Sequence, residues 1–363
     1  METSTRRIGI GIVGCGGIAR MHATALKALE EEGACTVVGC ADIVPEKAQA
    51  LARDFGIPRW YDDARPLLDQ PDVEAITVCT NPPFHTPAAL LAAERRKHVI
   101  VEKPMAMDLA DADRAIEATR RAGVRFGVIF MRRFWPAAQR ARKAIDDGKL
   151  GRLILGDCIL KWYRGEPYYR SAPWRGTWAG ENGAVLVNQA VHAIDMFLWL
   201  MAPAGRLESV YGRWANLTHP YIECEDNAVA ALRWSNGALG VLSVSISIEP
   251  TLGSRITVSG DRGFTVSVLE HPEGRMGVND VWTIAGEEEE MRAVYERERA
   301  AAEHHFRPFP ICHKWQLQDF LDAIREGRDP LVTGEEGRRS MELIAALRRS
   351  HETGAEVRLP LHG

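Results

Sequence analysis

The first 130 residues alternate between short apolar segments and helical segments, and this alternation limits the fold more than any other feature of the chain. Short strands are expected at 8–13, 35–41, 74–79, 98–101 and 125–130. Helices are expected at 18–31, 45–55, 86–95 and 108–123, with Thr86 and Asp108 as N-caps of the last two. Strands and helices in this order form βαβ units around a parallel sheet with both faces covered. We therefore predict an α/β domain here.

The pattern changes after about residue 135, where strand segments follow one another with few helices between them. The strands are expected at 153–161, 207–214, 229–234, 238–248, 255–259, 264–269 and 281–284. Ser235-Asn236-Gly237 is a hairpin signal between two of them. Helices are expected at 188–200, 314–326 and 334–353, and the charged segment 287–299 as a solvated helix or a mobile loop. These patterns predict an α+β domain with an open, mostly antiparallel sheet, and we divide the chain into residues 1–133 and 134–363.

Size, charge and cysteine usage narrow the class of protein. A chain of 363 residues fits two domains, and its net charge of −4 argues against a nucleic-acid partner. No apolar run reaches the roughly 18 to 20 residues of a membrane span, and the N-terminal residues lack the pattern of a secretory signal. The seven cysteines are widely spaced without a C-x-x-C pair, as expected for free thiols. We expect a cytoplasmic protein that acts on a small molecule, with no nucleic acid and no membrane as partner.

A glycine-rich turn follows the first expected strand directly. Gly14-Cys15-Gly16-Gly17-Ile18-Ala19 matches the pattern G-x-G-x-x-G/A at the start of the first helix. Gly14 permits a tight turn, Gly16 lets the backbone approach a pyrophosphate, and Ala19 allows close packing of helix and strand. The N–H groups at the start of the helix, from Gly17 and Ile18 onward, favour bound phosphate. The motif predicts a Rossmann dinucleotide-binding domain.

Asp42 decides which dinucleotide is expected. It ends the second strand, 23 residues beyond Ala19 (42 − 19), where an acidic side chain takes the hydrogen bonds of the adenosine ribose. A carboxylate repels a 2′-phosphate, and the neighbouring Ile43 cannot pair with one. We therefore expect NAD(H) rather than NADP(H) as cofactor.

Lys103 follows the fourth strand, at the edge of the sheet where ligands of a parallel sheet bind. It lies between Glu102 and Pro104, and the proline biases its backbone toward an extended conformation. A lysine that is partly desolvated beside a cationic nicotinamide can act as an acid or base. Lys103 is a candidate catalytic residue.

Three motifs together resemble the glucose–fructose oxidoreductase/inositol dehydrogenase (Gfo/Idh/MocA) family over nearly the whole chain. They are Gly14-x-Gly16-x-x-Ala19, Glu102-Lys103-Pro104 and Gly183-x4-Asn188-x3-His192-x2-Asp195. The resemblance implies that Lys103 is the active-site lysine and His192 the general acid/base. It also implies that the loop Thr80-Asn81-Pro82-Pro83-Phe84-His85 borders the nicotinamide, that His313 lines the substrate cleft, and that the protein forms a homodimer or homotetramer through the open sheet.

The chain departs from the inositol dehydrogenase pattern at Asn188, where an aspartate usually stands four residues before the histidine. Asn188 cannot act as a base, but its amide can bind a substrate hydroxyl. The spacing i, i+4, i+7 predicts that Asn188, His192 and Asp195 share one face of an otherwise apolar helix. His192 would take the hydroxyl proton, since an imidazole titrates near neutral pH, and Asp195 would orient it or contact substrate; a satisfied core histidine is the alternative.

Residues 162–178 concentrate aromatic side chains, with arginines between them. The segment contains Trp162, Tyr163, Tyr168, Tyr169, Trp174 and Trp178, and the arginines are Arg164, Arg170 and Arg175. Aromatic faces cover the C–H faces of a sugar while guanidinium groups bind its hydroxyls. We expect Trp162, Tyr163, Arg164, Trp174 and Arg175 to bind substrate. An aromatic loop that packs at a domain or subunit boundary is the alternative, and the arginines also leave room for an acidic sugar or a nucleotide sugar.

The expected function is that of an NAD(H)-dependent oxidoreductase acting on CH–OH groups of a sugar, polyol or inositol-type substrate. Cofactor contacts are expected from Gly14, Gly16, Gly17, Ile18, Ala19, Asp42, Thr80, Asn81, His85, Glu102 and Lys103. No metal is expected, because His304, His305, Cys312 and His313 lack the spacing of a zinc site. Two rivals stay open: an NAD-dependent glycoside hydrolase that oxidises its substrate transiently, and a non-catalytic NAD-responsive binding protein.

Overall fold

The computed structural model describes residues 6–304 and 309–361, and the side chains of 302–309 lie outside that description. The chain divides into two compact units. The first comprises Met1–Met131 and Phe309–Arg338, and the second comprises Arg132–Pro308 and Arg339–His362. Residues 309–338, which the sequence division placed in the second domain, therefore belong to the first.

The first unit contains a six-stranded, all-parallel sheet in the order β3-β2-β1-β4-β5-β6. Its strands are β1 (Ile8–Val13), β2 (Cys35–Ala41), β3 (Trp60–Tyr61), β4 (Ala75–Val78), β5 (His98–Val101) and β6 (Phe126–Val128). The chain runs outward from β1 in one direction and then returns to β4 on its other side. The strand order reverses between β1 and β4, and open α/β sheets bind ligands at the carboxyl ends of the strands beside such a point. The Rossmann prediction is confirmed.

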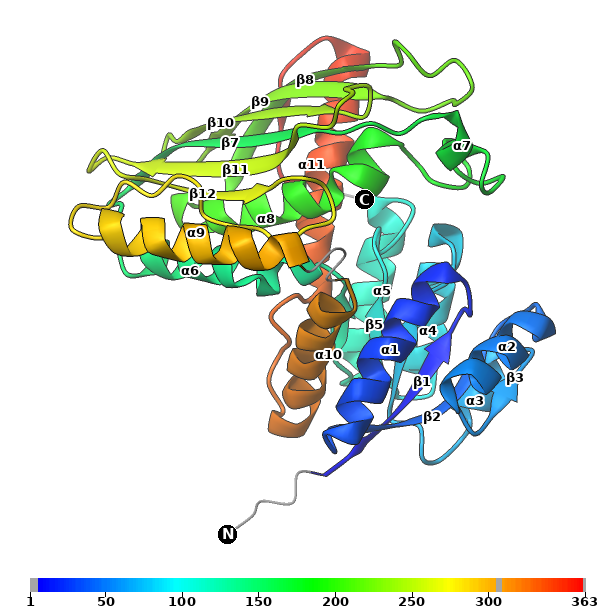
Figure 1. The fold of residues 1–363 in the computed structure, drawn as a ribbon. Coiled ribbons are helices and arrows are strands. Elements are labelled where there is room, and N and C mark those ends of the chain that lie inside the picture. Colours follow the sequence, from blue (N-terminus) through cyan, green and yellow to red (C-terminus); the bar gives the residue numbers. More distant parts are fainter. Residues whose placement is uncertain (1–5, 305–308, 362–363) are drawn as a thin grey trace. The chain divides into compact units, whose positions relative to one another are not determined.

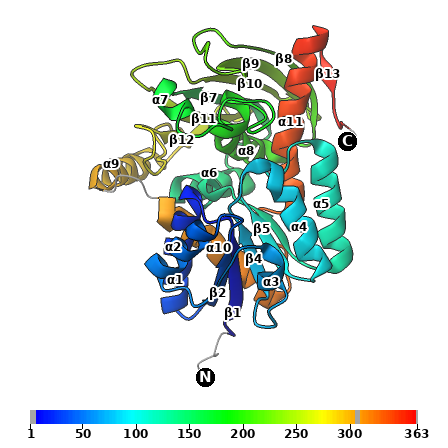
Figure 2. The same ribbon diagram turned by 90° about the vertical axis from the view of Figure 1, so that its right-hand side faces the viewer.

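Helices pack against this sheet (Figures 1 and 2). They are α1 (Gly17–Glu31), α2 (Pro45–Phe55), α3 (Ala64–Leu68), α4 (His85–Glu94), α5 (Leu109–Ala122) and α10 (Phe309–Glu326). As predicted, the Asp108 side chain caps α5 by accepting a hydrogen bond from Asp111 N. The prediction of Thr86 as N-cap of α4 is wrong, because the 3₁₀ turn Pro82–Phe84 leads directly into a helix that begins at His85.

Helix α10 joins the first unit because it buries an apolar face beside α1. Leu317, Phe320 and Leu321 are fully buried. Gln316 Nε2 donates to the carbonyl oxygen of Val128, at the end of β6, over 2.7 Å. Helix α10 is therefore bound to the last strand of a sheet that lies 188 residues earlier in the chain.

The second unit contains a seven-stranded sheet in the order β12-β11-β7-β10-β9-β8-β13. Its strands are β7 (Leu153–Lys161), β8 (Leu207–Ala215), β9 (Asn227–Trp234), β10 (Leu239–Ser245), β11 (Gly253–Gly260), β12 (Thr265–Glu270) and β13 (Val357–Arg358). Every neighbouring pair is antiparallel except β7 and β10. This confirms the mostly antiparallel sheet and the hairpin between β9 and β10. Residues 281–284 form only an isolated bridge at Trp282, not the expected strand.

Helix α8 (Val191–Met201) packs on one face of this sheet, because the strands carry glycines beneath it. A Cβ atom at Gly156 would lie 2.7 Å from the Phe197 ring, and one at Gly240 would lie 2.6 Å from the Trp234 ring. Phe197 and Trp234 meet edge to face, with ring centroids 5.6 Å apart. The absence of side chains at these glycines leaves room for the two large rings.

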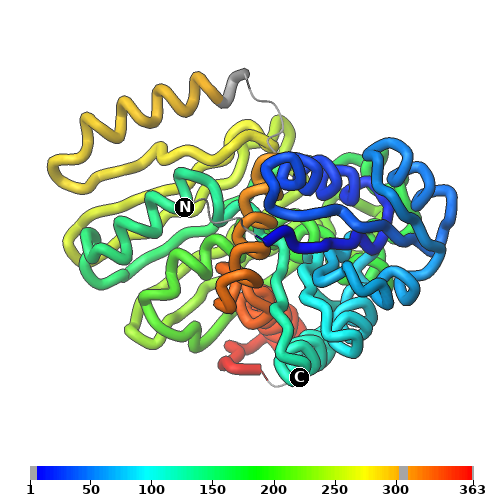
Figure 3. Tube along the Cα trace, turned by 90° about the horizontal axis from the view of Figure 1, so that it is seen from below, coloured from blue at the N-terminus to red at the C-terminus, as the bar shows by residue number. Residues whose placement is uncertain are grey.

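The remaining helices of the second unit are α6 (Pro136–Asp146), α7 (Glu166–Tyr169), α9 (Glu288–His304) and α11 (Gly334–Thr353), which begins in the first unit. Figure 3 shows α9, the charged segment, beside the edge of the sheet. Arg140 of α6 pairs with Glu298 of α9 over 2.5 Å. No helix in the described ranges is long and apolar enough to cross a membrane.

Candidate active site

The glycine turn has the shape that a dinucleotide phosphate requires. Gly14 has a φ of +87°, and a Cβ atom there would lie 2.6 Å from the backbone nitrogen of Thr80. Gly16 and Gly17 have nothing within 4 Å of a built Cβ, so their backbone is open to a ligand. No side chain caps the N-terminus of α1. These residues fit a pyrophosphate, which would accept the N–H groups at the start of the helix.

Asp42 holds the glycine turn through both of its carboxylate oxygens. Its Oδ2 accepts a hydrogen bond from Cys15 N at 2.7 Å, and its Oδ1 accepts one from Val44 N at 2.9 Å. Each carboxylate oxygen has a second lone pair, so both oxygens can still accept a ribose hydroxyl. Ile43 beside it is 80% exposed and offers no charge to a 2′-phosphate. The contact with Cys15 was not predicted from the sequence.

His85 joins two loops that follow strands of the parallel sheet. Its Nδ1 lies 2.7 Å from the carbonyl oxygen of Pro104, and its Nε2 lies 2.9 Å from that of Thr80. Burial lowers the pKa of His85, and a neutral imidazole donates to one of these two oxygens at a time. His85 thus links the loop after β4 to the loop that carries Lys103, while Asn81 is exposed at the start of the 3₁₀ turn.

A buried network fixes the residue before Lys103. The Oε1 atom of Glu102 lies 2.9 Å from His22 Nε2 and 3.4 Å from His313 Nε2. Its Oε2 accepts a hydrogen bond from the backbone nitrogen of Lys103 at 3.1 Å. On the far side of the His22 ring, Nδ1 lies 2.8 Å from the Thr77 hydroxyl. The network therefore connects α1, β4 and α10 to the main chain of Lys103.

Glu102, at the centre of this network, is held in its charged form. Burial opposes the charge of Glu102, but hydrogen bonds from His22 and His313 outweigh it and hold the pKa of Glu102 well below its usual range. Burial lowers the pKa of His22. The three ligand atoms lie within 4.8 Å of one another, close enough to hold a cation, but donor–acceptor pairing already satisfies them. His313, expected at the substrate cleft, is 1% exposed and takes part in this network.

His22 was not singled out from the sequence. It lies on the buried face of α1 with Ala19, Ala23 and Leu26. A histidine at helical spacing from small and apolar residues was the available signal. Its partners are 80 and 55 residues away in the chain, so the sequence pattern could not name them.

The expected face of Asn188, His192 and Asp195 is not one continuous α-helix. Residues 185–189 form a turn of π-helix, and α8 begins after it. Asn188 therefore precedes α8, while His192, 7% exposed, lies in its first turn. The helix expected to begin at Asn188 therefore begins at Val191 instead, and the residues before it follow the different period of a π turn.

Asp195 is paired rather than turned to solvent. Its two oxygens accept hydrogen bonds from Arg133 over 2.6 and 2.8 Å, and the two side chains are 1% and 2% exposed. Asn188 Nδ2 donates to the Tyr168 hydroxyl at 2.9 Å and also to Glu181. The structure thus joins Asn188 to the aromatic segment and Asp195 to a buried arginine.

The aromatic segment is held together largely by its own members. Trp162 is 3% exposed, and the Arg164 guanidinium lies 5.1 Å from its ring centre. Arg164 also pairs with Glu273. Arg175 lies over the rings of Tyr168 and Trp174, whereas Tyr163 is 42% exposed. Much of the segment is therefore packed within the second unit, whereas Tyr163 remains exposed.

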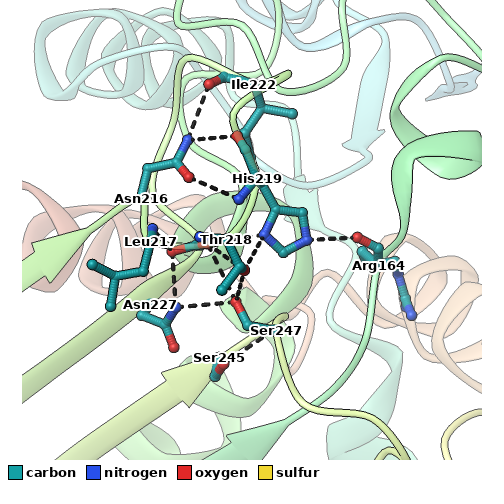
Figure 4. Close-up of polar contacts among 10 residues, drawn as sticks. Arg164, Asn216, Leu217, Thr218, His219, Ile222, Asn227, Ser245 and Ser247 are labelled. Atoms are coloured by element: carbon teal, nitrogen blue, oxygen red, sulfur yellow. Dashed lines mark hydrogen bonds and ion pairs between the residues drawn. The ribbon is translucent and has the colours of Figure 1, made fainter.

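A second buried histidine–carboxylate pair, also absent from the sequence predictions, lies in the loop between β8 and β9 (Figure 4). His219 Nδ1 lies 2.9 Å from Asp226 Oδ2, and His219 Nε2 lies 2.7 Å from the carbonyl oxygen of Arg164. Asp226 also accepts hydrogen bonds from the backbone nitrogens of Leu217 and Thr218. The pair ties the end of β7 to this loop.

Comparison with known proteins gives two family matches. Residues 8–130 match the oxidoreductase family with NAD-binding Rossmann fold, and residues 142–359 match the C-terminal alpha/beta domain of the same oxidoreductase family. Myo-inositol 2-dehydrogenase of Thermotoga maritima is 27% identical over 361 residues, covering 96% of this chain and 98% of its own. The scyllo-inositol 2-dehydrogenase (NAD(+)) of Bacillus subtilis is 25% identical, covering 97% and 96%.

Solved structures show the same similarity. The WlbA dehydrogenase from Bordetella pertussis, in complex with NADH and UDP-GlcNAcA, superposes with a TM-score of 0.83 at 32% identity, covering 98% of this chain and 100% of its own. The two matched regions span nearly the whole chain and coincide with the glycine turn, the lysine loop and the α8 helix described above. The chain therefore belongs to the Gfo/Idh/MocA family of NAD-binding oxidoreductases.

Proposed function

We propose that this protein, an NAD-dependent dehydrogenase of a sugar or polyol, oxidises a secondary hydroxyl with Lys103 and His192 exchanging the hydroxyl proton. Bound NAD would accept the hydride at nicotinamide C4. Gly14, Gly16 and the N-terminus of α1 would hold its pyrophosphate, and Asp42 its adenosine ribose. His192 would take the proton of the hydroxyl as its carbon is oxidised, and Lys103 would polarise the oxygen.

The single observation that carries the proposal is the way Lys103 is held. Its backbone nitrogen donates to Glu102, and the carbonyl oxygen of the next residue, Pro104, is bound by His85. Lys103 follows β5, at the sheet edge where NAD-binding residues gather. A main chain fixed on both sides of one lysine favours a role that needs accurate placement.

His192 supports the proposal from the second unit. It lies in the first turn of α8, next to an asparagine and a glutamine that share the Tyr168 hydroxyl. An imidazole has an ordinary pKa near 6.5, so it can accept and return a proton close to neutral pH. Asp195 is engaged with Arg133, so in this proposal it fixes α8 rather than binding substrate.

The test is the pair of variants Lys103→Ala and His192→Ala. Each is expected to lower kcat by at least about a hundredfold, the low end for loss of an acid/base group, while NADH still binds by fluorescence titration. Exposed Lys47→Ala and His271→Ala are the matched controls and should keep kcat. Near-normal kcat in both active-site variants would contradict the assignment.

A panel of polyols, inositols, aldoses, anhydrosugars and uronates, followed by NADH absorbance, identifies the substrate. The named relatives suggest inositols on one side and a nucleotide sugar on the other. Release of a sugar from a glycoside with no net NADH would instead favour the NAD-dependent hydrolase. NADH binding without turnover of any member would favour the non-catalytic binding protein.

We also propose that two or four copies associate in the cytoplasm through the sheet face opposite α8. Exposed apolar side chains point outward from neighbouring strands there: Ile159, Tyr211, Val229 and Val241, each at least 39% exposed. Seven buried cysteines without a disulfide fit a reducing compartment. Light scattering should show a dimer or tetramer that Val241→Lys dissociates, whereas a monomeric wild type would contradict the association.

A further inference from the structure

The three arginines of the aromatic segment differ in their partners. Arg164 forms an ion pair with Glu273, and Arg170 forms one with Glu166 over 2.5 Å. Arg175 forms no ion pair with any residue of the described ranges. Two of the three cations are therefore neutralised within the fold, and the third is not.

The surroundings of Arg175 hold the guanidinium without satisfying it. Its Cζ lies 4.3 Å from the centre of the Tyr168 ring and 4.6 Å from that of Trp174. One nitrogen donates to the Tyr168 hydroxyl at 2.5 Å. The Nε atom is buried and has no hydrogen-bond partner among the described residues. Aromatic faces attract a cation but accept no strong hydrogen bond, so most of the five N–H groups need another acceptor.

The Tyr168 hydroxyl connects this cation to the turn before α8. The same oxygen accepts hydrogen bonds from Asn188 Nδ2 and Gln189 Nε2, both at 2.9 Å. Asn188 stands four residues before His192. Arg175 is thus separated by one shared oxygen from the residues that precede the proposed acid/base.

The acidic group nearest to this network is already engaged. Glu181 is 1% exposed and accepts hydrogen bonds from the backbone nitrogen of Gly176, at 2.5 Å, and from Asn188. Asn188 itself carries no charge, whereas an aspartate at this position would carry one. A second carboxylate at this position would repel an anion, so the asparagine suits an anionic substrate better than the aspartate would.

We propose that Arg175 binds an oxyanion of the substrate, either a carboxylate or a phosphate, so that this enzyme prefers anionic sugars over neutral polyols. The inference rests on the proposed dehydrogenase function and names the substrate class of that site. A planar guanidinium binds both kinds of oxyanion with paired N–H groups. The rings of Tyr168 and Trp174, which lie close to the guanidinium, would limit its movement in such a contact.

Four matched sugars separate the two oxyanions: glucose, glucuronate, UDP-glucose and UDP-glucuronate. Glucuronate adds only the carboxylate, whereas UDP-glucose adds a diphosphate together with its uridine, and UDP-glucuronate adds both oxyanions. NADH formation is measured for wild type, Arg175→Gln and Arg175→Lys, with Arg170→Gln on the same segment as the control. We expect higher kcat/KM for the anionic sugars, and an Arg175→Gln loss of about 10- to 100-fold for them, mainly in KM, as for a lost hydrogen bond to a charged group. Neutral sugars should change less than about threefold.

Equal losses on neutral and anionic sugars, or a wild-type preference for glucose, would overturn the inference and assign Arg175 a packing role. Calorimetric titration of the NADH-loaded protein with the same four sugars measures binding of the anionic group independently of catalysis. Binding of an anionic sugar that Arg175→Gln abolishes supports the inference even where no NADH forms. Failure of both anionic classes to bind more tightly than glucose overturns it, whether or not the dehydrogenase reaction is observed.

Discussion

Each unit buries a histidine beside a carboxylate at the same distance, 2.9 Å, but the two pairs are built from different partners. Glu102 of the first unit receives the two imidazoles of His22 and His313 and one backbone nitrogen. Asp226 of the second unit receives two backbone nitrogens, one imidazole and side chains of the same loop. The first pair joins distant segments to Lys103, whereas the second holds the loop between β8 and β9 and joins it to the end of β7. We expect changes to the first to appear in the reaction and changes to the second in stability.

Breaking the second pair should have the largest effect. Asp226→Ala leaves a buried imidazole and two backbone N–H groups without their acceptor, and is expected to lower the free energy of unfolding by about 3–5 kcal/mol. Urea denaturation measures the loss. Asp146→Ala, which removes an exposed pair with Arg142, is the control and should cost less than about 1 kcal/mol. A comparable loss in both variants would remove the distinction between buried and exposed pairs.

Weakening the first pair should act on turnover. Glu102→Gln removes the charge and replaces one of the two carboxylate oxygens with an amide donor, so either the Lys103 main chain or His22 loses its acceptor. We expect kcat to fall about 10- to 100-fold, as for a catalytic group displaced by roughly an ångström, with a smaller change in KM for NAD. Steady-state kinetics and urea denaturation are measured together. A variant that loses stability but keeps kcat would show that Glu102 serves the fold alone.

Asp42 extends the comparison to a half-buried carboxylate that holds the glycine turn. Asp42→Ala removes the repulsion of a 2′-phosphate and should reduce the preference for NAD over NADP in kcat/KM by about tenfold. Asp42→Asn keeps an acceptor for Cys15 N and should hold the turn better. If the asparagine variant loses NAD affinity as fully as the alanine variant, charge rather than turn geometry governs binding.

Mild acid should reduce the stability of the first unit but not that of the second, and this is the smallest of the expected effects. Burial lowers the pKa of His22 and of His85 in the first unit. A lowered histidine pKa gives stability that is complete above the unfolded value, near 6.5, and is lost as pH falls below it. Hydrogen bonds hold the pKa of Asp226 below its usual range despite burial, so its contribution is lost only as pH falls below about 4.

Hydrogen exchange between pH 7 and 5, corrected for intrinsic rates, is the measurement. Protection of β1, β4 and β5 is expected to decline in this range while that of β8 and β9 stays constant. Simultaneous loss in both sheets would mean that the two histidines do not set the acid sensitivity of the first unit.

The elements that depend on local residue patterns could be predicted from the sequence. The ranges of β7, α2 and α11, and the ends of α5 at Asp108 and Gly123, follow from apolar periodicity and from capping residues. The two-residue strand β3 has no period to detect. The π turn before α8 carries no known signal, so the expected start of the helix at Asn188 was wrong.

The networks were missed for a different reason. His22, Glu102 and His313 come from three segments that are 80 and 211 residues apart, and only the closed fold brings them together. Likewise, the sequence presents Arg164, Arg170 and Arg175 as equals. They differ in their ion pairs, because the fold places a carboxylate beside Arg164 and another beside Arg170.

The return of α10 to the first unit has a consequence for protein engineering and for evolution. A fragment that stops near residue 133 lacks α10, with its buried Leu317, Phe320 and Leu321, and exposes the side of α1 that α10 contacts. Such a fragment would expose a hydrophobic patch on α1. We expect it to aggregate rather than fold as an independent nucleotide-binding domain. Recombination that replaces the coding sequence of residues 1–131 must therefore also replace that of residues 309–338 with a compatible segment. This requirement favours inheritance of the whole chain as one unit.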